Sequence, residues 1–274
     1  PGLELAVQPS ELRCFKNGEY TREQLHIQEN LDDCTILMGV KEVRIDALLP
    51  DKTYLFFAHV AKKQPYNRDL LRAILEKNIT LIDYEYLTRP SGERVVAFGH
   101  WAGVVGAYNG LRAYGRRTGR FSLQPAHEYR DMQSMYDDMQ QLDLGNIKIL
   151  ITGGGRVAYG AMQTLRQLHL REVSPEEYLS QNFNEPVMAR IDPQHYVART
   201  DGKSFDLQYF FNTPQAHKST FKPFTKVTDM LVTAHFWHPA SPVFMTPEDM
   251  QESDFRIGVI ADISCDIKGP IPST

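Results

Sequence analysis

The sequence predicts an α/β fold in which helices cover parallel sheets. Short apolar runs at 35–40, 53–58 and 79–82 have the length and β-branched content of strands, and a helical stretch at 67–77 lies between two of them. A second series starts with the apolar run 147–152, which leads into a glycine-rich turn and a helix. Strands that alternate with helices are typical of parallel βαβ units. Further runs at 229–234 and 256–261 are expected to extend the second sheet.

The length predicts two domains. The chain has 274 residues, of which 42% are hydrophobic, and this is more than one compact core usually holds. We expect the division near Phe121, giving domains at 1–121 and 122–274, with a polar amphipathic connecting helix at 128–142. Glycines recur every three or four residues from Gly99 to Gly110, which predicts a helix with one backbone-thin face for tight packing.

Composition excludes several classes of partner. Thirty basic and 34 acidic side chains give a net charge of −4, so neither nucleic acid nor an anionic membrane is an expected partner. No apolar stretch reaches the roughly 18 residues of a membrane helix. Three scattered cysteines are too few for a disulfide framework or a closed zinc site, and they favour the cytoplasm. His235 and His238 lack a nearby carboxylate or cysteine to complete a metal site, so we expect no metal and small-molecule partners.

A glycine loop predicts dinucleotide binding in the second domain. Gly153, Gly155 and Ala158 fit the pattern G-x-G-x-x-A after a strand and at the start of a helix. The first glycine permits a tight turn, the second lets the backbone approach a pyrophosphate, and the small third residue allows close packing. The pyrophosphate would bind the amides that open the helix, so Arg156 and Val157 are expected to contact the cofactor as well.

The strand after this loop does not identify the cofactor. An acid about 20 residues beyond the loop usually binds the adenosine ribose, but the strand predicted at 169–174 ends in Ser174. Glu172 would point sideways, and Arg171 suits a 2′-phosphate equally, so both NAD and NADP stay open. The polar stretch after Ser174 is expected to be an unusually long connection. His235 and Asp262 follow later strands and are expected to line the nicotinamide half of the site.

Candidate catalytic residues follow the strands of the first domain. Lys41 and His59 come just after two apolar runs, and Glu85 follows a third. The carboxyl ends of parallel strands face the ligand crevice, so these side chains are expected in one cleft. The pKa values of a lysine beside Glu42 and of a histidine among lysines can be moved towards neutrality for proton transfer. Arg94, beyond a Pro-Ser-Gly turn, suits capture of a substrate carboxylate.

Several separate motifs resemble one known family. They are Val40-Lys-Glu-Val43, Lys52-Thr-Tyr-Leu-Phe-Phe-Ala-His59, Lys62-Lys-Gln-Pro-Tyr-Asn67, Leu81-Ile-Asp-Tyr-Glu85, Val96-Ala-Phe-Gly99 and Ala261-Asp-Ile-Ser-Cys-Asp266. Together they are similar to the lysine-ketoglutarate reductase and lysine-forming saccharopine dehydrogenase family, a branch of the alanine dehydrogenase and transhydrogenase superfamily. The resemblance implies two Rossmann-like domains with parallel sheets that flank an interdomain cleft. It also implies that L-lysine, 2-oxoglutarate and NADH or NADPH are reversibly converted to saccharopine.

The resemblance assigns a role to each candidate in the first domain. It implies that Lys41 and His59 transfer protons, that Glu42 and Glu85 temper the positive charge, and that Arg94 holds a substrate carboxylate. Lys62 is expected to bind substrate too. These roles agree with the chemistry, because forming and reducing an imine requires several proton transfers around one carbon. Neighbouring carboxylates are needed because a cleft lined only by cations would be too positive for Lys41 or His59 to stay deprotonated.

Departures from the family pattern leave two alternatives open. Arg44 replaces a usual proline, and His100 follows Gly99 where other residues are usual, although neither change removes a named role. Family members also have a strand and a basic loop before Pro1, which this first domain lacks, and further segments after Thr274. The alternatives are an amino-acid dehydrogenase of the alanine type and a catalytically weak dinucleotide-binding fragment. The sequence specifies no oligomeric state.

Overall fold

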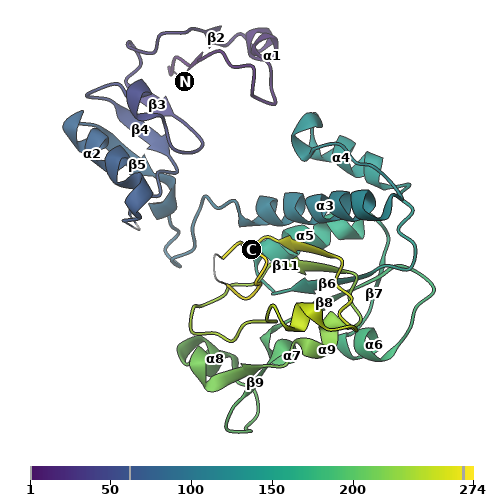
Figure 1. The fold of residues 1–274 in the computed structure, drawn as a ribbon. Coiled ribbons are helices and arrows are strands. Elements are labelled where there is room, and N and C mark those ends of the chain that lie inside the picture. Colours follow the sequence, from purple (N-terminus) through teal and green to yellow (C-terminus); the bar gives the residue numbers. More distant parts are fainter. Residues whose placement is uncertain (1, 62, 267–268) are drawn as a thin grey trace. The chain divides into compact units, whose positions relative to one another are not determined.

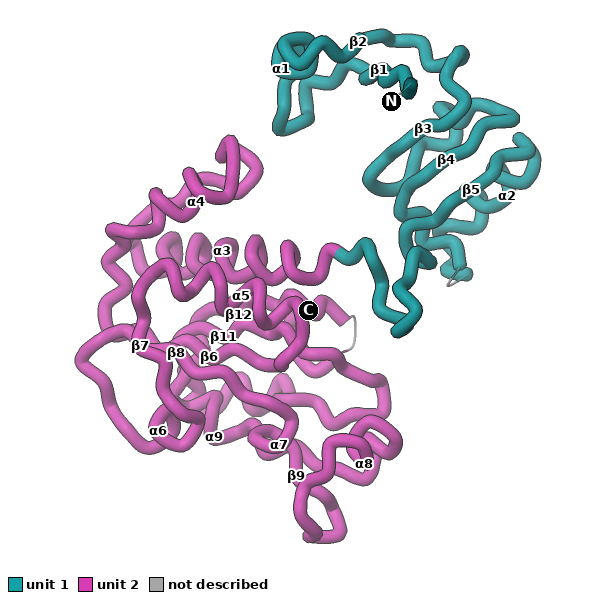
Figure 2. The backbone as a smooth tube through the Cα atoms, turned by 180° about the vertical axis from the view of Figure 1, so that it is seen from behind, with its two compact units in different colours: residues 1–97 teal, residues 98–274 magenta. Residues whose placement is uncertain are grey.

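The chain forms two compact units, residues 1–97 and 98–274 (Figure 2). The structure, a computed structural model, describes residues 2–61, 63–266 and 269–274. Each unit contains a parallel sheet with a hydrophobic core of its own. The expected α/β class with parallel sheets is therefore confirmed.

The first unit contains a three-stranded parallel sheet in the order β3-β4-β5. Its strands are β3 (Ile36–Met38), β4 (Thr53–Phe56) and β5 (Thr80–Asp83), and helix α2 (Arg68–Glu76) connects β4 to β5. Alternate residues of β3 and β4 pack against the buried residues of α2, which include Leu70 and Ile74. A separate parallel pair precedes this sheet; it consists of β1 (Ala6–Val7) and β2 (His26–Ile27), with helix α1 (Asn17–Arg22) between them.

The second unit contains a five-stranded sheet in the order β12-β11-β6-β8-β7, with every neighbouring pair parallel (Figure 1). Its strands are β6 (Lys148–Thr152), β7 (Arg171–Glu172), β8 (Val187–Ile191), β11 (Met230–Thr233) and β12 (Val259–Asp262). The strands expected at 147–152, 229–234 and 256–261 are thus confirmed. The expected long connection after Ser174 is wrong, because the segment contains strand β8, which lies between β6 and the edge strand β7.

Helices cover both faces of this sheet. Side chains of one face pack with α3 (Gly99–Thr118), α4 (Met132–Met139) and α5 (Arg156–Arg166). Side chains of the other face pack with α6 (Pro175–Ser180), α7 (Pro193–Tyr196), α8 (Leu207–Asn212) and α9 (Lys222–Thr225). A separate two-stranded antiparallel sheet is formed by β9 (Val197–Arg199) and β10 (His217–Ser219). The arrangement is a doubly wound α/β layer structure.

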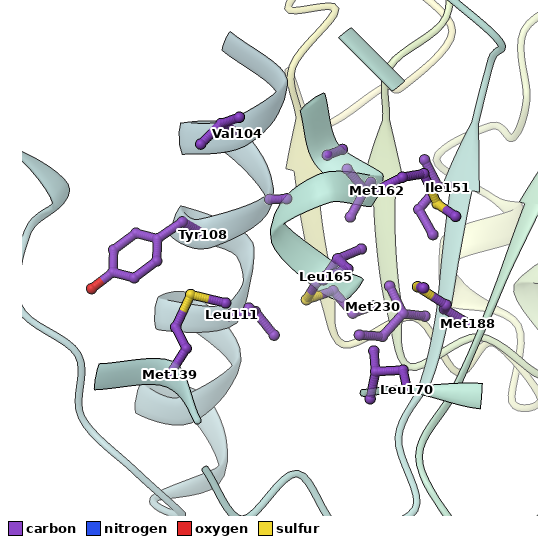
Figure 3. Packing of buried hydrophobic residues seen from close by; sticks show 14 of the residues in the cluster. Val104, Tyr108, Leu111, Met139, Ile151, Met162, Leu165, Leu170, Met188 and Met230 are labelled. Atoms are coloured by element: carbon purple, nitrogen blue, oxygen red, sulfur yellow. The ribbon is translucent and has the colours of Figure 1, made fainter. Parts of the chain in front are cut away.

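Helices α3 and α5 touch backbone to backbone, as the glycine spacing predicts. A Cβ atom at Gly103 would lie 1.9 Å from the Val157 carbonyl oxygen, and one at Gly160 would lie 2.0 Å from the His100 carbonyl oxygen. Figure 3 shows apolar side chains of these helices, such as Leu111 and Leu165, in the cluster that also contains Ile151 of β6 and Met188 of β8. Because of this packing, α3 belongs to the second compact unit, whereas the division predicted near Phe121 would separate it from α5. That division stays a prediction about the family's domains.

Candidate active site

The three strand ends of the first unit carry the predicted catalytic residues at one edge of its sheet. The register pairs Met38 with Leu55 and Phe56 with Asp83, so the carboxyl ends of β3, β4 and β5 are level. Lys41, His59 and Glu85 each follow one of these ends within three residues. The expected clustering of strand-end residues at this edge therefore agrees with the topology.

His59 and Glu42 are in direct contact. The His59 Nδ1 atom lies 2.5 Å from the Glu42 Oε1 atom, and the two side chains are 21% and 31% exposed. Burial acts to raise the pKa of Glu42, but its own backbone N–H, the hydrogen bond and charge of His59, and the Lys41 ammonium together hold that pKa below its ordinary value. Glu42 is thus an anion, and it accepts a hydrogen bond that the Nδ1–H group of His59 donates. The imidazole Nε2 atom is then the one that can exchange a proton with substrate.

The backbone of His59 adopts a left-handed conformation, with φ of +53°. Non-glycine residues seldom adopt this conformation, and its strain is often kept where a site requires it. The buried Asn67 side-chain amide donates to the Ala58 carbonyl at 3.2 Å and to the His59 carbonyl at 3.4 Å. The turn is therefore fixed by a residue that the sequence analysis did not single out.

Asp83 connects the ends of β4 and β5. Its Oδ1 atom accepts hydrogen bonds from the Ala58 N–H at 3.2 Å and from the Glu85 N–H at 2.9 Å. Because Ala58 precedes His59, this carboxylate fixes the positions of both predicted site residues, His59 and Glu85. Its place at the last position of a strand was the available sequence signal, but nothing in the sequence distinguished it from an exposed strand end.

Glu85 and Arg94 form an ion pair. The Arg94 Nη1 atom lies 3.5 Å from the Glu85 Oε1 atom. The Glu85 side chain is 9% exposed, whereas the Arg94 side chain is 45% exposed. The carboxylate therefore anchors the arginine from inside while part of the guanidinium stays accessible to an anion. Lys62, also predicted to bind substrate, lies outside the described residues.

The glycine loop of the second unit has the geometry of a dinucleotide turn. It joins β6 to α5, and Gly153 has φ of +96°. A Cβ atom at Gly153 would lie 2.7 Å from the Ala234 carbonyl oxygen, so this position needs glycine. Gly155 is the N-cap of α5, and apart from its chain neighbours no residue that the structure describes has an atom within 4 Å of the position its Cβ would take. Open space thus borders the first turn of the helix, which begins with Arg156 and Val157.

Strand β8 lies beside this loop, and an acidic residue directly follows it. The register aligns Thr152 with Ile191, and the Gly153 N–H donates to the Ile191 carbonyl at 2.8 Å. Asp192 comes next, so it lies beside the glycine loop. Its carboxylate Oδ1 atom is 2.6 Å from the Arg190 Nη1 atom, which also donates to the Gly153 carbonyl at 3.1 Å.

Ser174 occupies a different place from the one expected. Strand β7 is at the edge of the sheet and is separated from β6 by β8, so Ser174 does not follow the strand next to the loop. Its hydroxyl accepts a hydrogen bond from the Glu177 N–H at 3.1 Å and caps helix α6. A contact of Ser174 with cofactor stays a prediction that this position does not favour.

His235 follows β11 and Asp262 is the last residue of β12, but their side chains bind other groups of the protein. The His235 Nδ1 atom lies 2.7 Å from the Thr152 hydroxyl, and the ring stacks on Phe244 at 4.5 Å. Burial lowers the pKa of His235 to about 4, against the weaker opposing effect of Asp262. Asp262 accepts hydrogen bonds from the hydroxyls of Thr233 and Thr274. Their predicted cofactor contacts stay predictions.

Within the described ranges, no three His, Cys, Asp or Glu residues are grouped as a metal site would require. None of the helices in the described part of the chain is long and apolar enough to cross a membrane.

Fold and loop geometry together define a two-unit α/β protein of the type found in alanine dehydrogenase and transhydrogenase. A solved L-alanine dehydrogenase superposes with a TM-score of 0.56 at 14% identity, covering 94% of this chain and 65% of that one. A transhydrogenase from Sinorhizobium meliloti gives a TM-score of 0.51 at 14% identity, covering 100% of this chain and 72% of that one. The family model described as alanine dehydrogenase/PNT, N-terminal domain, matches residues 1–105.

Sequence relatives narrow this class. The rat mitochondrial alpha-aminoadipic semialdehyde synthase is 31% identical over 98% of this chain and 34% of its own length. The NAD(+), L-lysine-forming saccharopine dehydrogenase of Emericella nidulans is 25% identical over 98% of this chain and 68% of its own length. The chain belongs to the lysine-ketoglutarate reductase and lysine-forming saccharopine dehydrogenase family. It spans about a third of the length of the mammalian relatives.

Proposed function

We propose that the protein is a nicotinamide-dependent oxidoreductase acting on a CH–NH bond. It interconverts L-lysine, 2-oxoglutarate and NADH or NADPH with saccharopine and the oxidised cofactor. The observation that carries the proposal is the contact of His59 with Glu42 at the strand edge that also bears Lys41. Relatives named as lysine-forming saccharopine dehydrogenases support this choice of substrates.

The groups of the first unit provide the proton transfers. Condensing the lysine amine with the ketone of 2-oxoglutarate expels one water and requires protons to be removed from nitrogen and delivered to oxygen. His59 can exchange such protons at Nε2, because Glu42 accepts the hydrogen bond of Nδ1. Lys41 is the second proton-transfer residue. General acid–base groups of this kind contribute roughly 10²- to 10⁴-fold to a rate.

Arg94 is proposed to bind a carboxylate of the oxo acid. Its guanidinium is partly exposed and anchored by Glu85, so it is oriented before substrate arrives. The acidic partner also offsets the positive charge of Arg94 at this edge of the sheet. Lys62 is proposed as an additional substrate cation.

The second unit has groups that fit a nicotinamide dinucleotide. Gly155 leaves open space at the first amides of α5, an eleven-residue helix whose dipole favours a pyrophosphate. Gly153, Arg156 and Val157 are proposed to complete this contact. The cofactor, when bound, supplies the hydride that reduces the imine carbon. Cytoplasmic location stays a prediction from the cysteine content, and small molecules are the proposed partners.

An assay with separate substrate pairs tests this function. Oxidation of NADH and of NADPH is followed with lysine plus 2-oxoglutarate, and separately with pyruvate plus ammonia. The proposal expects consumption only with the first pair. Consumption only with the second pair would establish the alanine-type alternative instead, and cofactor binding without turnover on either pair would support the weakly catalytic fragment. Lys41→Met is expected to lower turnover much more than cofactor affinity, since it removes a proton-transfer group.

A further inference from the structure

A threonine and a histidine join the end of β6 to the segment that follows β11. The His235 Nδ1 atom lies 2.7 Å from the Thr152 hydroxyl oxygen, which also accepts a hydrogen bond from the Ala234 N–H at 3.3 Å. Thr152 is fully buried and is the last residue of β6. The contact is therefore one residue away from Gly153, where the turn proposed to bind a pyrophosphate begins.

The direction of this hydrogen bond follows from the groups around it. Burial lowers the pKa of His235 to about 4, so near neutral pH its ring is uncharged and has one N–H and one acceptor nitrogen. In the described part of the chain, Nδ1 is the only acceptor within hydrogen-bond distance of the Thr152 hydroxyl. The hydroxyl thus donates to Nδ1, and the ring proton is on Nε2.

The Nε2–H group of His235 has no hydrogen-bond partner among the described residues, although the side chain is buried. The ring stacks on Phe244 at 4.5 Å and lies 6.1 Å from the Tyr196 ring, measured between ring centroids. A buried N–H without a partner destabilises the folded state, and phenylalanine would fill this aromatic place without one. Stability alone therefore does not account for a histidine at this position.

The glycine turn packs against the backbone of the same histidine. A Cβ atom at Gly153 would lie 2.8 Å from the His235 Cα atom. The His235 backbone is held in turn by the Ser264 hydroxyl, which donates to its carbonyl at 2.8 Å. A shift of Thr152 relative to His235 would therefore move the turn against a backbone that other contacts keep in place.

We infer that His235 is a positioning residue for dinucleotide binding, because its Nδ1 atom holds the Thr152 hydroxyl and so keeps the Gly153 turn in the shape that receives a pyrophosphate. The inference rests on the proposed function, since it requires the glycine loop to bind a nicotinamide dinucleotide. His235 acts through Thr152 and needs no contact with the cofactor. A turn that already has its binding shape loses less conformational freedom when the ligand binds, so the ligand binds more tightly.

His235→Phe separates this role from packing. Phenylalanine keeps a ring against Phe244 and removes the acceptor of the Thr152 hydroxyl. It exchanges one unpaired polar group, Nε2–H, for another, the hydroxyl, so the free energy of unfolding in urea should stay close to that of the wild type. The dissociation constant of the reduced cofactor that the wild type prefers, NADH or NADPH, should rise about tenfold in fluorescence titrations of the full chain. The KM for 2-oxoglutarate at saturating cofactor should change by less than about twofold.

Two further variants test the pair itself. His235→Asn should restore most of the affinity, because the Oδ1 atom of asparagine can replace Nδ1 as the acceptor of the Thr152 hydroxyl. Thr152→Val removes the hydroxyl at nearly constant volume and should weaken cofactor binding about as much as His235→Phe. The double variant Thr152→Val with His235→Phe should bind no more weakly than either single variant, because both remove the same hydrogen bond.

His217→Phe is the matched control. His217 is also buried beside aromatic rings, its Nδ1–H donates to the Thr213 carbonyl at 3.1 Å, and its Nε2 atom likewise has no partner in the described ranges. It lies in β10, outside the five-stranded sheet, so this variant should leave the cofactor dissociation constant unchanged.

Three results would overturn the inference while leaving the proposed function in place. They are an unchanged cofactor affinity in His235→Phe, no recovery in His235→Asn, and additive losses in the double variant. If His235→Phe does not fold, unchanged affinity in Thr152→Val overturns the inference in the same way. Wild type that binds neither dinucleotide would overturn the proposed function itself.

Discussion

Replacing His59 with glycine separates the strain at this position from its chemistry. The side chain lies on a residue with φ of +53°, and a left-handed conformation costs an L-residue roughly 1–2 kcal/mol that glycine avoids. The variant loses the hydrogen bond to Glu42, worth about 1 kcal/mol once the exposure of both side chains is considered. Glycine also adds roughly 0.5–1 kcal/mol of chain entropy to the unfolded state. The free energy of unfolding should thus change by no more than about 1 kcal/mol.

Turnover should fall far more than stability. Loss of a general acid–base group is expected to lower kcat by roughly 10²- to 10⁴-fold, with cofactor affinity close to wild type. The free energy of unfolding is measured by urea denaturation, and kcat is measured from reduced-cofactor oxidation with lysine and 2-oxoglutarate. The same two measurements apply to Lys63→Gly, since Lys63 also has φ of +53° and has no proposed role. That control should keep kcat while gaining the same relief of strain.

Two results would refute this reasoning. A glycine variant of His59 with nearly wild-type kcat would remove the residue from the proton transfers. A variant that loses several kcal/mol of stability would show that the side chain, rather than the Asn67 and Asp83 hydrogen bonds, maintains the turn.

Four other variants each test one further contact or charge state of the protein. Gly103→Ala should destabilise the second unit by about 2 kcal/mol or more in urea denaturation, because its Cβ would lie 1.9 Å from a carbonyl oxygen; unchanged stability would contradict the α3–α5 packing. Gly155→Ala should leave the unfolding free energy nearly unchanged and weaken cofactor binding in titrations, so equal cofactor affinity would count against the loop. Arg94→Lys should raise the KM for 2-oxoglutarate about tenfold with little effect on the KM for lysine, whereas an equal rise in both would refute its role. Burial lowers the pKa of His235 from 6.5 to about 4, so between these pH values the unfolded chain binds a proton that the folded chain does not. The free energy of unfolding should therefore fall by about 3 kcal/mol as the pH falls through this interval. His235→Asn should remove this part of the pH dependence of stability.

The apolar strands and the glycine loop could be predicted because their signals are local. The run before Gly153 is buried at every position of β6, and the turn needs glycine where a side chain would meet the Ala234 carbonyl. Strand β8 has no such signal, because Arg190 interrupts its apolar run. It also lies much further from the loop than the usual roughly 20 residues, since β7 and α6 intervene.

The candidate site was predictable to a similar extent. Strand ends identify Lys41, His59 and Glu85, because topology alone brings the carboxyl ends of parallel strands to one edge. The hydrogen bonds that Asn67 and Asp83 make to the backbone of Ala58 could not be predicted, since each joins a side chain to a residue at least nine positions away. The neutral state of His235 depends on burial by Phe244 and other distant residues, which no local pattern reveals.

The structure of the product tests the central claim most directly. The chain is incubated with lysine labelled with ¹⁵N at the side-chain amine, 2-oxoglutarate, and reduced cofactor carrying deuterium at the transferable position. Mass spectrometry should find one product that contains the carbon skeletons of both substrates, joined through the labelled nitrogen, with one added deuterium on carbon. Formation of glutamate or another free amino acid in place of this secondary amine would contradict the proposed reaction.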